Sequence, residues 1–506
     1  MACFGVRLGS AAATVAAYKA GKTDVIANDY GERSTPMMVC YLDTETIVGQ
    51  SAKQALQRHG ATTAWGMALL IGRNLADPVV QEIAKGLLCK VVKKDGELCY
   101  SFEINGKERV VSARSALIEM LKKLLEVCKS YDSSSPTKAV ITSPADFGPE
   151  QKKILSQCAI SAGFKVLRVI SEPAACTLAY GLGQEDRLKT QYVLVYDWGK
   201  WTFSAAILQV IGGLCRTVAM VTTTAVGGHQ LDSAIVDLLL SDFQRQWKAD
   251  LRGNSRAVHK LRMAAEEAKH TLSSNQTATI HIDSIHEGID YQYTLTRGRF
   301  EGICATPIRN GLGFVTAVLE KANMEKSRLT HVALAGGSCR VPRLQQLVTE
   351  EFPSCEVLCS VPSDEVVAIG GAIEAGLLQQ RGGTMKEEGT QHIPCCSQDL
   401  WLTCPDANTS NSSPILLLTR HTPLPCSRDA LIRNLKPLNS SQDTLSIELH
   451  EGTEAEPIAK ILVPAAEEME LLVSIEWLRD DKVTLSAKQP LTNWTTQLSL
   501  HCSAPV

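Results

Sequence analysis

The sequence predicts an α/β fold built from two related halves, followed by a small all-β module. Helix and strand patterns alternate up to about residue 380. A similar hairpin pattern opens each half of this region, and short strands separated by Asn, Ser, Pro and Gly follow it. Because a chain of 506 residues is too long to form one core, several domains are expected on length alone.

The alternation of helices and strands is clearest in the first half of the chain. Residues 112–131 place their apolar side chains on one helical face, and residues 149–164 begin with a proline suited to a first helical turn. Apolar runs predict buried strands at 138–144 and 166–170, and a further helix at 172–183. Helices that alternate with buried strands predict a largely parallel sheet with helices on its faces.

The composition changes after residue 380. Residues 381–396 are polar and contain glycines, which is typical of a linker. Residues 397–506 read as short strands with no convincing helix, which predicts a β-sandwich-like domain. The expected organisation is therefore an α/β domain at 1–380, a linker at 381–396 and a β-sandwich at 397–506.

Composition excludes several classes of function. The net charge is −3, so broad affinity for nucleic acids or acidic membranes is not expected. No stretch reads as a bilayer span, and the N-terminus lacks the apolar core of a signal peptide. The 17 cysteines include no Cys-x-x-Cys pair, so we expect reduced thiols in a cytosolic protein rather than a zinc site or disulfide framework.

An internal repeat points to a ligand between the two halves. Residues 5–18 (GVRLGSAAATVAAY) and 195–208 (VYDWGKWTFSAAIL) share a strand, a residue at a fixed point, a glycine two positions later, a tight turn and a returning strand. The residue at the fixed point is Arg7 in the first copy and Asp197 in the second. Inward-facing N–H groups in such a turn form an anion-binding nest. The repeat predicts a duplicated fold with an anionic ligand between the copies.

Six further segments resemble the 70-kDa heat-shock chaperone family, in the order of that family and across residues 1–380. They are VISEPAACTLAYGLG (169–183), AVGGHQLD (225–232), AEEAKHTLSS (265–274), IDSIHEGIDYQYTLTRGRFE (282–301), LAGGSCRVPRLQQLV (334–348) and SVPSDEVVAIGGAIEAGLL (360–378). The resemblance implies the actin-like, ribonuclease H-like ATPase fold, with two lobes and ATP in the cleft between them.

The resemblance also assigns residues to the nucleotide. Those assigned to the phosphates are Arg7, Gly9, Ser10, Asp197, Gly199, Thr202, Gly227 and Gly228. Those assigned to adenosine are Glu266, Lys269, Ser273, Gly336, Gly337, Ser338, Arg340 and Asp364. Glu172 and Asp197 remain from the catalytic apparatus. Spacing alone leaves an alternative for the helical trio at 266, 269 and 273, namely an exposed charged face with an i, i+3 ion pair.

Arg7 is the main departure from the family, which has an aspartate there that helps hold hydrated magnesium. Exchanging a carboxylate for a guanidinium reverses the sign of the interaction with the metal, worth roughly 3 kcal/mol per unit pair at about 5 Å and an effective dielectric of about 20. We therefore expect weak or dispensable magnesium and no protein metal ligands. Arg7 either contacts phosphate oxygens directly or points out of the cleft.

Two other departures affect hydrolysis. Ala68 stands where the family has a lysine that positions the attacking water, and Ser204 stands where a further aspartate is expected. In the second phosphate loop, Lys200 and Trp201 replace two glycines. Losses at three points of one mechanism argue against efficient hydrolysis.

The remaining departures concern partners. Residues 380–396 lack the acidic–aliphatic linker of the family, and no helical lid is expected on the β-domain. Truncated members of this kind resemble the Hsp70-like subunit of the ribosome-associated complex. That subunit pairs stably with a zuotin-type J-protein, which stimulates a conventional 70-kDa heat-shock chaperone on nascent chains. The resemblance implies indirect contact with the ribosome and a cytosolic location. Two alternatives are a working ATP-dependent foldase and a nucleotide-binding scaffold unrelated to translation.

Overall fold

The structure is a computed structural model in which the chain forms two compact units, described here separately. The larger unit comprises Met1–Glu185 and Thr190–Met385, and the smaller one contains Lys386–Val506 together with Asp186–Lys189. The residues described are 1–184, 189–380, 395–405, 407–408, 414–424, 426–437, 443–452, 456–466, 469–477, 482–490 and 494–502. The predicted linker 381–396 lies outside them except for its last two residues.

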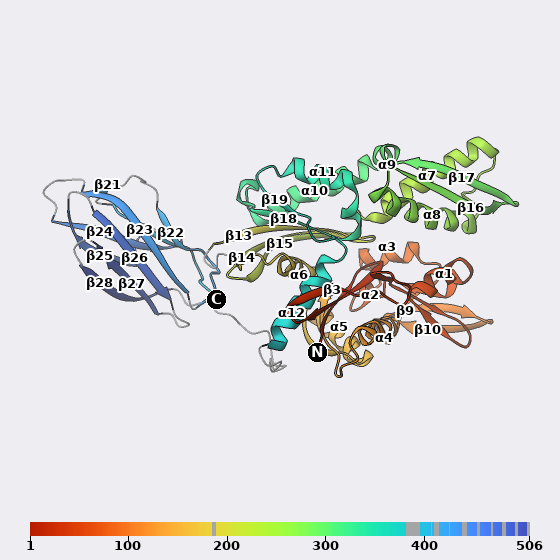
Figure 1. The fold of residues 1–506 in the computed structure, drawn as a ribbon, viewed down its shortest axis with the longest axis horizontal. Helices are drawn as coiled ribbons and strands as arrows, with labels where there is room; N and C mark the ends of the chain where they lie inside the picture. Colours follow the sequence, from red (N-terminus) through yellow and green to blue (C-terminus); the bar gives the residue numbers. More distant parts are fainter. Residues whose placement is uncertain are drawn as a thin grey trace. The chain divides into compact units, whose positions relative to one another are not determined.

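The first lobe of the larger unit is built on one mixed sheet (Figure 1, red to orange). Its strand order is β12-β11-β1-β2-β3, and β4 also pairs with β2. The strands are β1 (Cys3–Leu8), β2 (Ala12–Lys19), β3 (Lys22–Val25), β4 (Ser34–Pro36), β11 (Lys138–Ser143) and β12 (Lys165–Ser171). The β1–β2 pair is antiparallel, whereas β1–β11 and β11–β12 are parallel.

The second lobe repeats this plan. Its sheet has the order β15-β14-β13-β18-β19. The strands are β13 (Gln191–Trp198), β14 (Phe203–Ile211), β15 (Leu214–Thr223), β18 (His331–Ala335) and β19 (Glu356–Leu358). Here β13–β14 is antiparallel, and β13–β18 and β18–β19 are parallel, as in the first lobe. The predicted duplication and the predicted α/β class are confirmed.

Smaller sheets extend both lobes. The first lobe adds two three-stranded sheets, and the second adds one hairpin. These strands are β5 (Met38–Tyr41), β6 (Thr46–Val48), β7 (Thr63–Trp65), β8 (Lys90–Lys94), β9 (Glu97–Ile104), β10 (Lys107–Ser112), β16 (Thr277–His286) and β17 (Ile289–Thr296). They were not expected from the sequence, because several are short and their apolar alternation is weak.

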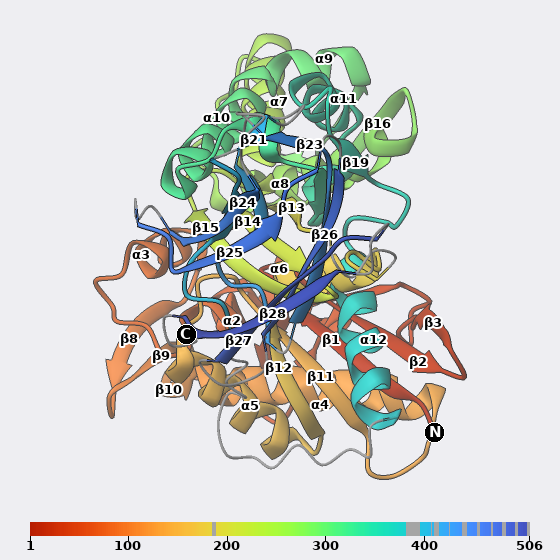
Figure 2. The ribbon, with the colours of Figure 1, turned by 90° about the vertical axis from the view of Figure 1, so that its left-hand side faces the viewer.

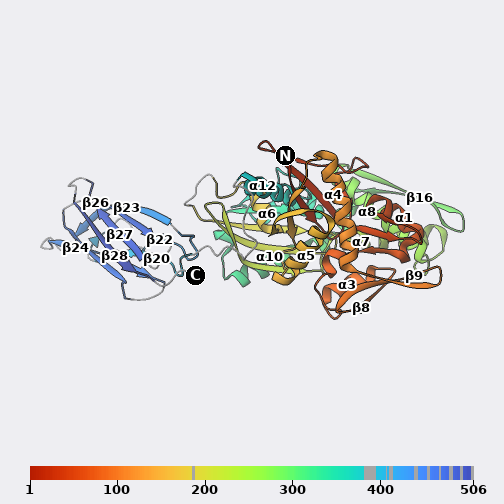
Figure 3. The ribbon, with the colours of Figure 1, turned by 90° about the horizontal axis from the view of Figure 1, so that it is seen from below.

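Helices cover the sheets. Those of the first lobe are α1 (Gln50–His59), α2 (Met67–Leu70), α3 (Pro78–Gly86), α4 (Ala113–Tyr131) and α5 (Pro149–Ala162). Those of the second lobe are α7 (Gly228–Trp247), α8 (Ser255–Ser274), α9 (Arg297–Ile303), α10 (Ala305–Ala322) and α11 (Pro342–Glu351). Figure 3 shows α4 lying beside α5, with which it packs. Three short 3-10 helices are η1 (Gly60–Thr62), η2 (Lys326–Arg328) and η3 (Gly337–Arg340).

Two further helices connect the lobes. Helix α12 (Val366–Gln380) follows the second-lobe sheet but packs on β1, β2 and β11 of the first lobe (Figure 2). It also packs on α6 (Glu172–Ala179), and a Cβ atom on Gly370 would lie 1.7 Å from the carbonyl oxygen of Ala175. Only glycine permits this approach. Each lobe has its own apolar core, and α6 and α12 pack between them.

The smaller unit contains two antiparallel sheets, as expected for a β-sandwich-like domain. One has the order β22-β20-β24-β25 and the other β21-β23-β26-β27-β28. The strands are β20 (Leu400–Thr403), β21 (Ala407–Asn408), β22 (Ile415–Leu418), β23 (Cys426–Pro437), β24 (Thr444–Glu451), β25 (Ala459–Pro464), β26 (Met469–Trp477), β27 (Lys482–Lys488) and β28 (Thr495–His501). The sequence reading missed β23, because its charged residues interrupt the apolar alternation.

Within the described residues, no single helix is long and apolar enough to span a membrane, although the bent pair α9 and α10 together meet the length and composition criteria.

Candidate functional site

A cavity of about 680 Å³ lies in the larger unit and is lined by both lobes. Its volume is in the range of small-molecule sites. It is lined by most of the residues expected to contact a nucleotide. These are Arg7, Gly9, Ser10, Glu172, Asp197, Gly199, Thr202, Glu266, Lys269, Gly336, Gly337, Ser338 and Asp364. Residues that the sequence places far apart therefore meet at one site.

Arg7 points into this cavity but is held by two carboxylates. Its Nη2 lies 3.0 Å from Oδ1 and 2.8 Å from Oδ2 of Asp197, and its Nε lies 3.2 Å from Oε1 of Glu172. The side chains of Arg7 and Asp197 are buried, with 9% and 7% exposure, and that of Glu172 is 13% exposed. The guanidinium thus places one positive charge between the two remnants of the catalytic apparatus, and both carboxyl groups face it.

Burial and charge act on this cluster in opposite directions. Burial lowers the pKa of Arg7, but the carboxylates of Asp197 and Glu172 outweigh it and leave that pKa above its ordinary value. Burial raises the pKa of Glu172 to about 7, against the lowering effect of Arg7. Glu172 therefore binds a proton more readily than an exposed glutamate does.

The residues at this position do not fit magnesium. Magnesium needs free oxygen ligands in near-octahedral geometry. Here the carboxylates of Asp197 and Glu172 already face a permanent cation, and Arg7 would repel a divalent one. Across the described part of the chain, no group of three or more His, Cys, Asp or Glu side chains is placed to hold a metal. The chemistry of the donor set thus favours a built-in guanidinium over a bound metal.

The second phosphate loop forms a tight turn between β13 and β14. The N–H of Gly199 donates to the carbonyl of Thr202 at 2.9 Å, and the N–H of Trp201 donates to Oγ of Ser10 at 3.2 Å. Nζ of Lys200 lies 2.7 Å from Oε1 of Glu266. The hydrogen bond from Trp201 to Ser10 therefore joins the second phosphate loop to the first.

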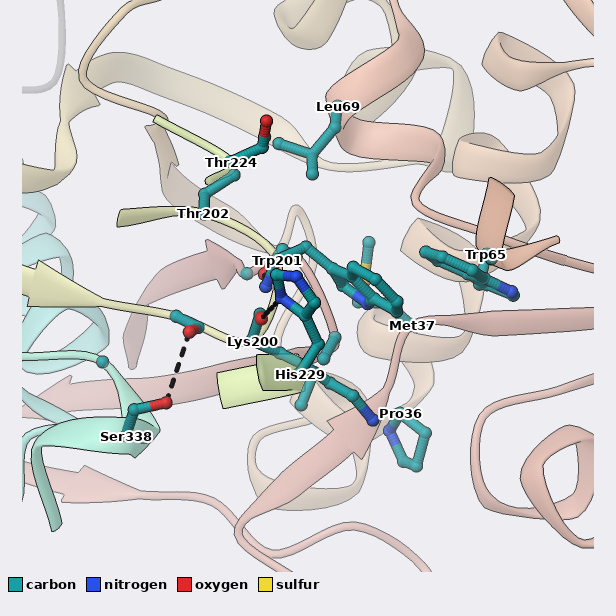
Figure 4. A pocket seen from close by; sticks show the side chains of 18 of the residues that line it. Pro36, Met37, Trp65, Leu69, Lys200, Trp201, Thr202, Thr224, His229 and Ser338 are labelled. Carbon is teal, nitrogen blue, oxygen red and sulfur yellow. Dashed lines mark hydrogen bonds between the residues drawn. The ribbon is translucent and has the colours of Figure 1, made fainter. Parts of the chain in front are cut away.

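The N-terminus of α7 is also tied to this turn. The N–H groups of Gly228 and His229 donate to the carbonyls of Gly199 and Lys200 at 2.9 and 3.0 Å. Nδ1 of His229 lies 2.8 Å from the same Lys200 carbonyl, so this nitrogen carries the proton (Figure 4). Burial lowers the pKa of His229, which keeps its ring neutral. These N–H groups thus have acceptors within the protein.

Among the residues assigned to adenosine, the acidic and basic groups are paired. Lys269 is buried, and its Nζ lies 2.6 Å from Oδ1 of Asp232. Burial raises the pKa of Glu266, but Lys200, Lys53 and Lys269 outweigh it and hold that pKa well below its ordinary value. The burial of Lys269 and its pairing with Asp232 contradict the alternative of an exposed face with an i, i+3 pair.

Gly336 directly follows β18, at a point where only glycine fits. Its φ is +85°, and a Cβ there would lie 2.5 Å from Oδ1 of Asp197 and 2.4 Å from the carbonyl oxygen of Trp198. Any side chain would therefore displace the carboxylate that holds Arg7. Ser338 lies two residues further along, and its hydroxyl donates to the Gly199 carbonyl at 3.3 Å (Figure 4).

Four assigned residues do not line the cavity, namely Gly227, Gly228, Ser273 and Arg340. Ser273 donates to the carbonyl of Lys269 at 3.2 Å, and Nε of Arg340 lies 2.7 Å from Oδ1 of Asp364. Ala68 is buried in the first-lobe core and is not a lining residue, whereas its neighbour Leu69 is.

The sequence reading missed several lining side chains, among them Met37, Trp65 and His229. Trp65, Trp201 and His229 form a continuous aromatic stack in the cavity (Figure 4). The one available signal was Trp201 itself, because an indole in place of a glycine must contact something. Its partners have no local signature, since they come from other elements.

The chain is similar to known proteins of one family. The family model described as Hsp70 protein matches residues 3–388. The chain is 38% identical to heat shock 70 kDa protein 14-A of Xenopus laevis, over 89% of this chain and 88% of that protein. It is 37% identical to heat shock 70 kDa protein 14 of Rattus norvegicus, over 89% and 88% of the two chains. It is 34% identical to heat shock 70 kDa protein 14 of Danio rerio, over 100% and 99%.

Proposed function

Because this chain belongs to the Hsp70 protein family, we propose that it is a chaperone subunit that binds ATP with little or no hydrolysis. The family binds ATP, and the cavity brings most of the assigned nucleotide residues together. The arrangement that carries the proposal is the Arg7 cluster. Arg7 replaces the residue that would help hold magnesium and pairs with both remaining carboxylates, Asp197 and Glu172.

The residues that would hold ATP are those that line the cavity. Gly336, Gly337 and Ser338 let the backbone approach a flat base and ribose, and Glu266 and Asp364 offer acceptors for hydroxyl groups. Arg7 and Lys200 lie at the phosphate loops and are donors suited to phosphate oxygens, although each is paired with a carboxylate in this structure. Ala68, at the position of the water-positioning lysine of the family, is buried and does not line the cavity, so we expect bound ATP to be retained rather than cleaved.

Nucleotide affinity and turnover test this part of the proposal. We expect the Kd for ATP to change little when magnesium is chelated, and single-turnover hydrolysis to be very slow. A conventional 70-kDa heat-shock chaperone, assayed in parallel, should lose activity on chelation. Turnover at the rate of that control, abolished by chelation, would instead support the alternative of a working foldase.

The proposed setting is the ribosome-associated complex. A chain that does not cycle between nucleotide states offers a constant surface, which suits a permanent partner better than a transient client. The proposed partner is a zuotin-type J-protein in the cytosol, with indirect contact to ribosomes and nascent chains and with a conventional 70-kDa heat-shock chaperone as the working foldase. A permanent interface of this kind buries more than about 2,000 Å².

Purification of the native protein from lysate tests the partner. We expect a stoichiometric J-protein that remains bound through size exclusion in moderate salt and sediments with ribosomes. A native monomer, or companions that change with client load, would contradict this proposal. A stable partner that does not sediment with ribosomes would favour the scaffold alternative.

A further inference from the structure

Trp201 belongs to one lobe by sequence and to the other by packing. It lies in the turn between β13 and β14 of the second lobe, and its neighbours Trp198 and Phe203 are part of the second-lobe core. The Trp201 side chain instead packs against the core of the first lobe. The indole therefore crosses the cleft.

The contact that it makes there is an aromatic stack. The rings of Trp201 and Trp65 are 4.6 Å apart at 19°, and those of Trp201 and His229 are 4.7 Å apart at 17°. Trp65 ends β7 in the first lobe, whereas His229 is in α7 of the second (Figure 4). Gly86, at the end of α3, lies against both indoles, because a Cβ there would be 2.9 Å from Trp65 and 3.2 Å from Trp201. The second-lobe indole is thus seated in a niche of the first lobe.

Three polar contacts cross the cleft beside the stack. Arg7 in β1 holds Asp197 in β13, and Ser10 accepts a hydrogen bond from the backbone N–H of Trp201. At the rim, Nζ of Lys53 in α1 lies 3.7 Å from Oε2 of Glu266 in α8. All these contacts are made by the chain itself. The family has a glycine at the position of Trp201. A glycine there could form only the backbone hydrogen bond to Ser10.

We propose that Trp201 is a latch that holds the two lobes closed over the cavity when no nucleotide is bound. The stack joins aromatic side chains of the two lobes, and the Arg7–Asp197 and Lys53–Glu266 ion pairs also cross the cleft. Opening the cleft exposes the indole and separates Arg7 from Asp197. Closure therefore does not depend on nucleotide, and nucleotide entry requires the latch to open. This inference stands on contacts within the larger unit and does not rest on a partner or on the ribosome.

Hydrogen exchange of the full-length, nucleotide-free protein tests the latch. Helices α1 and α8 form the rim that closure protects, since they contact each other. We expect Trp201→Gly to raise their exchange rates at least tenfold while the cores of both lobes stay protected. Trp247→Ala is the matched control, because it removes a half-exposed tryptophan of α7 that takes no part in the stack. It should leave α1 and α8 unchanged.

A second variant keeps the test decisive if Trp201→Gly fails to fold. Gly86→Val fills the niche without altering the latch residue, and it should give the same increase in exchange. Adding saturating ATP to the wild type should change exchange of α1 and α8 by less than twofold, whereas ATP should restore protection in Trp201→Gly. The latch is overturned if nucleotide-free wild type exchanges at the rim as fast as either variant, or if ATP slows its exchange tenfold. A failure of ATP to act on Trp201→Gly would count against ATP binding, while the nucleotide-free comparison would still decide the latch.

Discussion

Arg7 and Asp197 occupy equivalent positions in the two halves of the larger unit, and their side chains meet across the cleft. Arg7 pairs with Thr14 in the first hairpin, and Asp197 pairs with Ser204 in the second, at the same register. Nη2 of Arg7 lies 2.8 Å from Oδ2 of Asp197. In a duplicated fold, a carboxylate at both positions would need a cation between them. Here one copy supplies the cation itself.

Removing this cation should destabilise the fold. Arg7→Ala leaves Asp197 and Glu172 buried without a partner, which typically costs about 3–5 kcal/mol of unfolding free energy. Arg252→Ala is the matched control, because its ion pair with Asp250 at 3.4 Å joins two half-exposed side chains. That control should cost about 1 kcal/mol or less. Urea unfolding at neutral pH measures both. Equal, small losses would show that the Arg7 cluster contributes no more than a surface pair.

Restoring the carboxylate should restore a response to metal. Arg7→Asp places a third carboxylate beside Asp197 and Glu172, which creates a set of oxygen ligands that magnesium can bridge. We expect magnesium to raise the melting temperature of Arg7→Asp by several degrees and to leave the wild type unchanged, each compared with chelated samples. Because Arg7 faces the cavity, the variant should keep its proposed partner. The prediction fails if magnesium stabilises the wild type as much as the variant.

The raised pKa of Glu172 predicts a specific pH dependence. Burial raises this pKa to about 7, so the native state keeps a proton that the unfolded state releases near its ordinary value. The stability that Glu172 contributes is therefore present below the unfolded pKa and is lost as the pH rises through about 7, by up to about 3 kcal/mol. His270 acts in the opposite direction, because desolvation and the charge of Lys269 lower its pKa to about 4.

Comparison with Glu172→Gln separates the pH dependence that comes from Glu172 from that of His270. This variant keeps an oxygen acceptor for Arg7 but cannot titrate. The difference in unfolding free energy between wild type and variant should fall between about pH 5 and pH 8. Urea unfolding across this range measures it. A flat difference would show that the carboxyl titrates at the same pH in both states.

Peptide binding by the β-domain should not be coupled to nucleotide binding. Residues 381–396 lack the acidic–aliphatic run that docks on the ATPase lobes in the family. A fluorescent peptide should therefore bind weakly and with the same affinity with and without ATP. Fluorescence anisotropy measures this, with a conventional family chaperone as the positive control. A tenfold change on adding ATP, about 1.4 kcal/mol of coupling, would contradict the prediction.

Sequence alone determined the duplicated α/β unit, the β-rich unit after it and the family. Each rests on local signals: apolar periodicity, turn residues and segments such as AVGGHQLD (225–232) and LAGGSCRVPRLQQLV (334–348). It also identified Arg7 and Asp197 as counterparts, because the two hairpins share one layout. These properties are readable because backbone geometry follows from neighbouring residues.

Only the tertiary structure decided what these residues contact. Arg7 had two readings from sequence, and the fold brings it to Glu172 and Asp197, which are 165 and 190 positions away. Trp201 likewise meets Trp65 because β7 and the β13–β14 turn face each other across the cleft. Which side chains form contacts depends on their distance, burial and charge in the folded chain. A linear sequence carries no mark of contacts between elements so far apart.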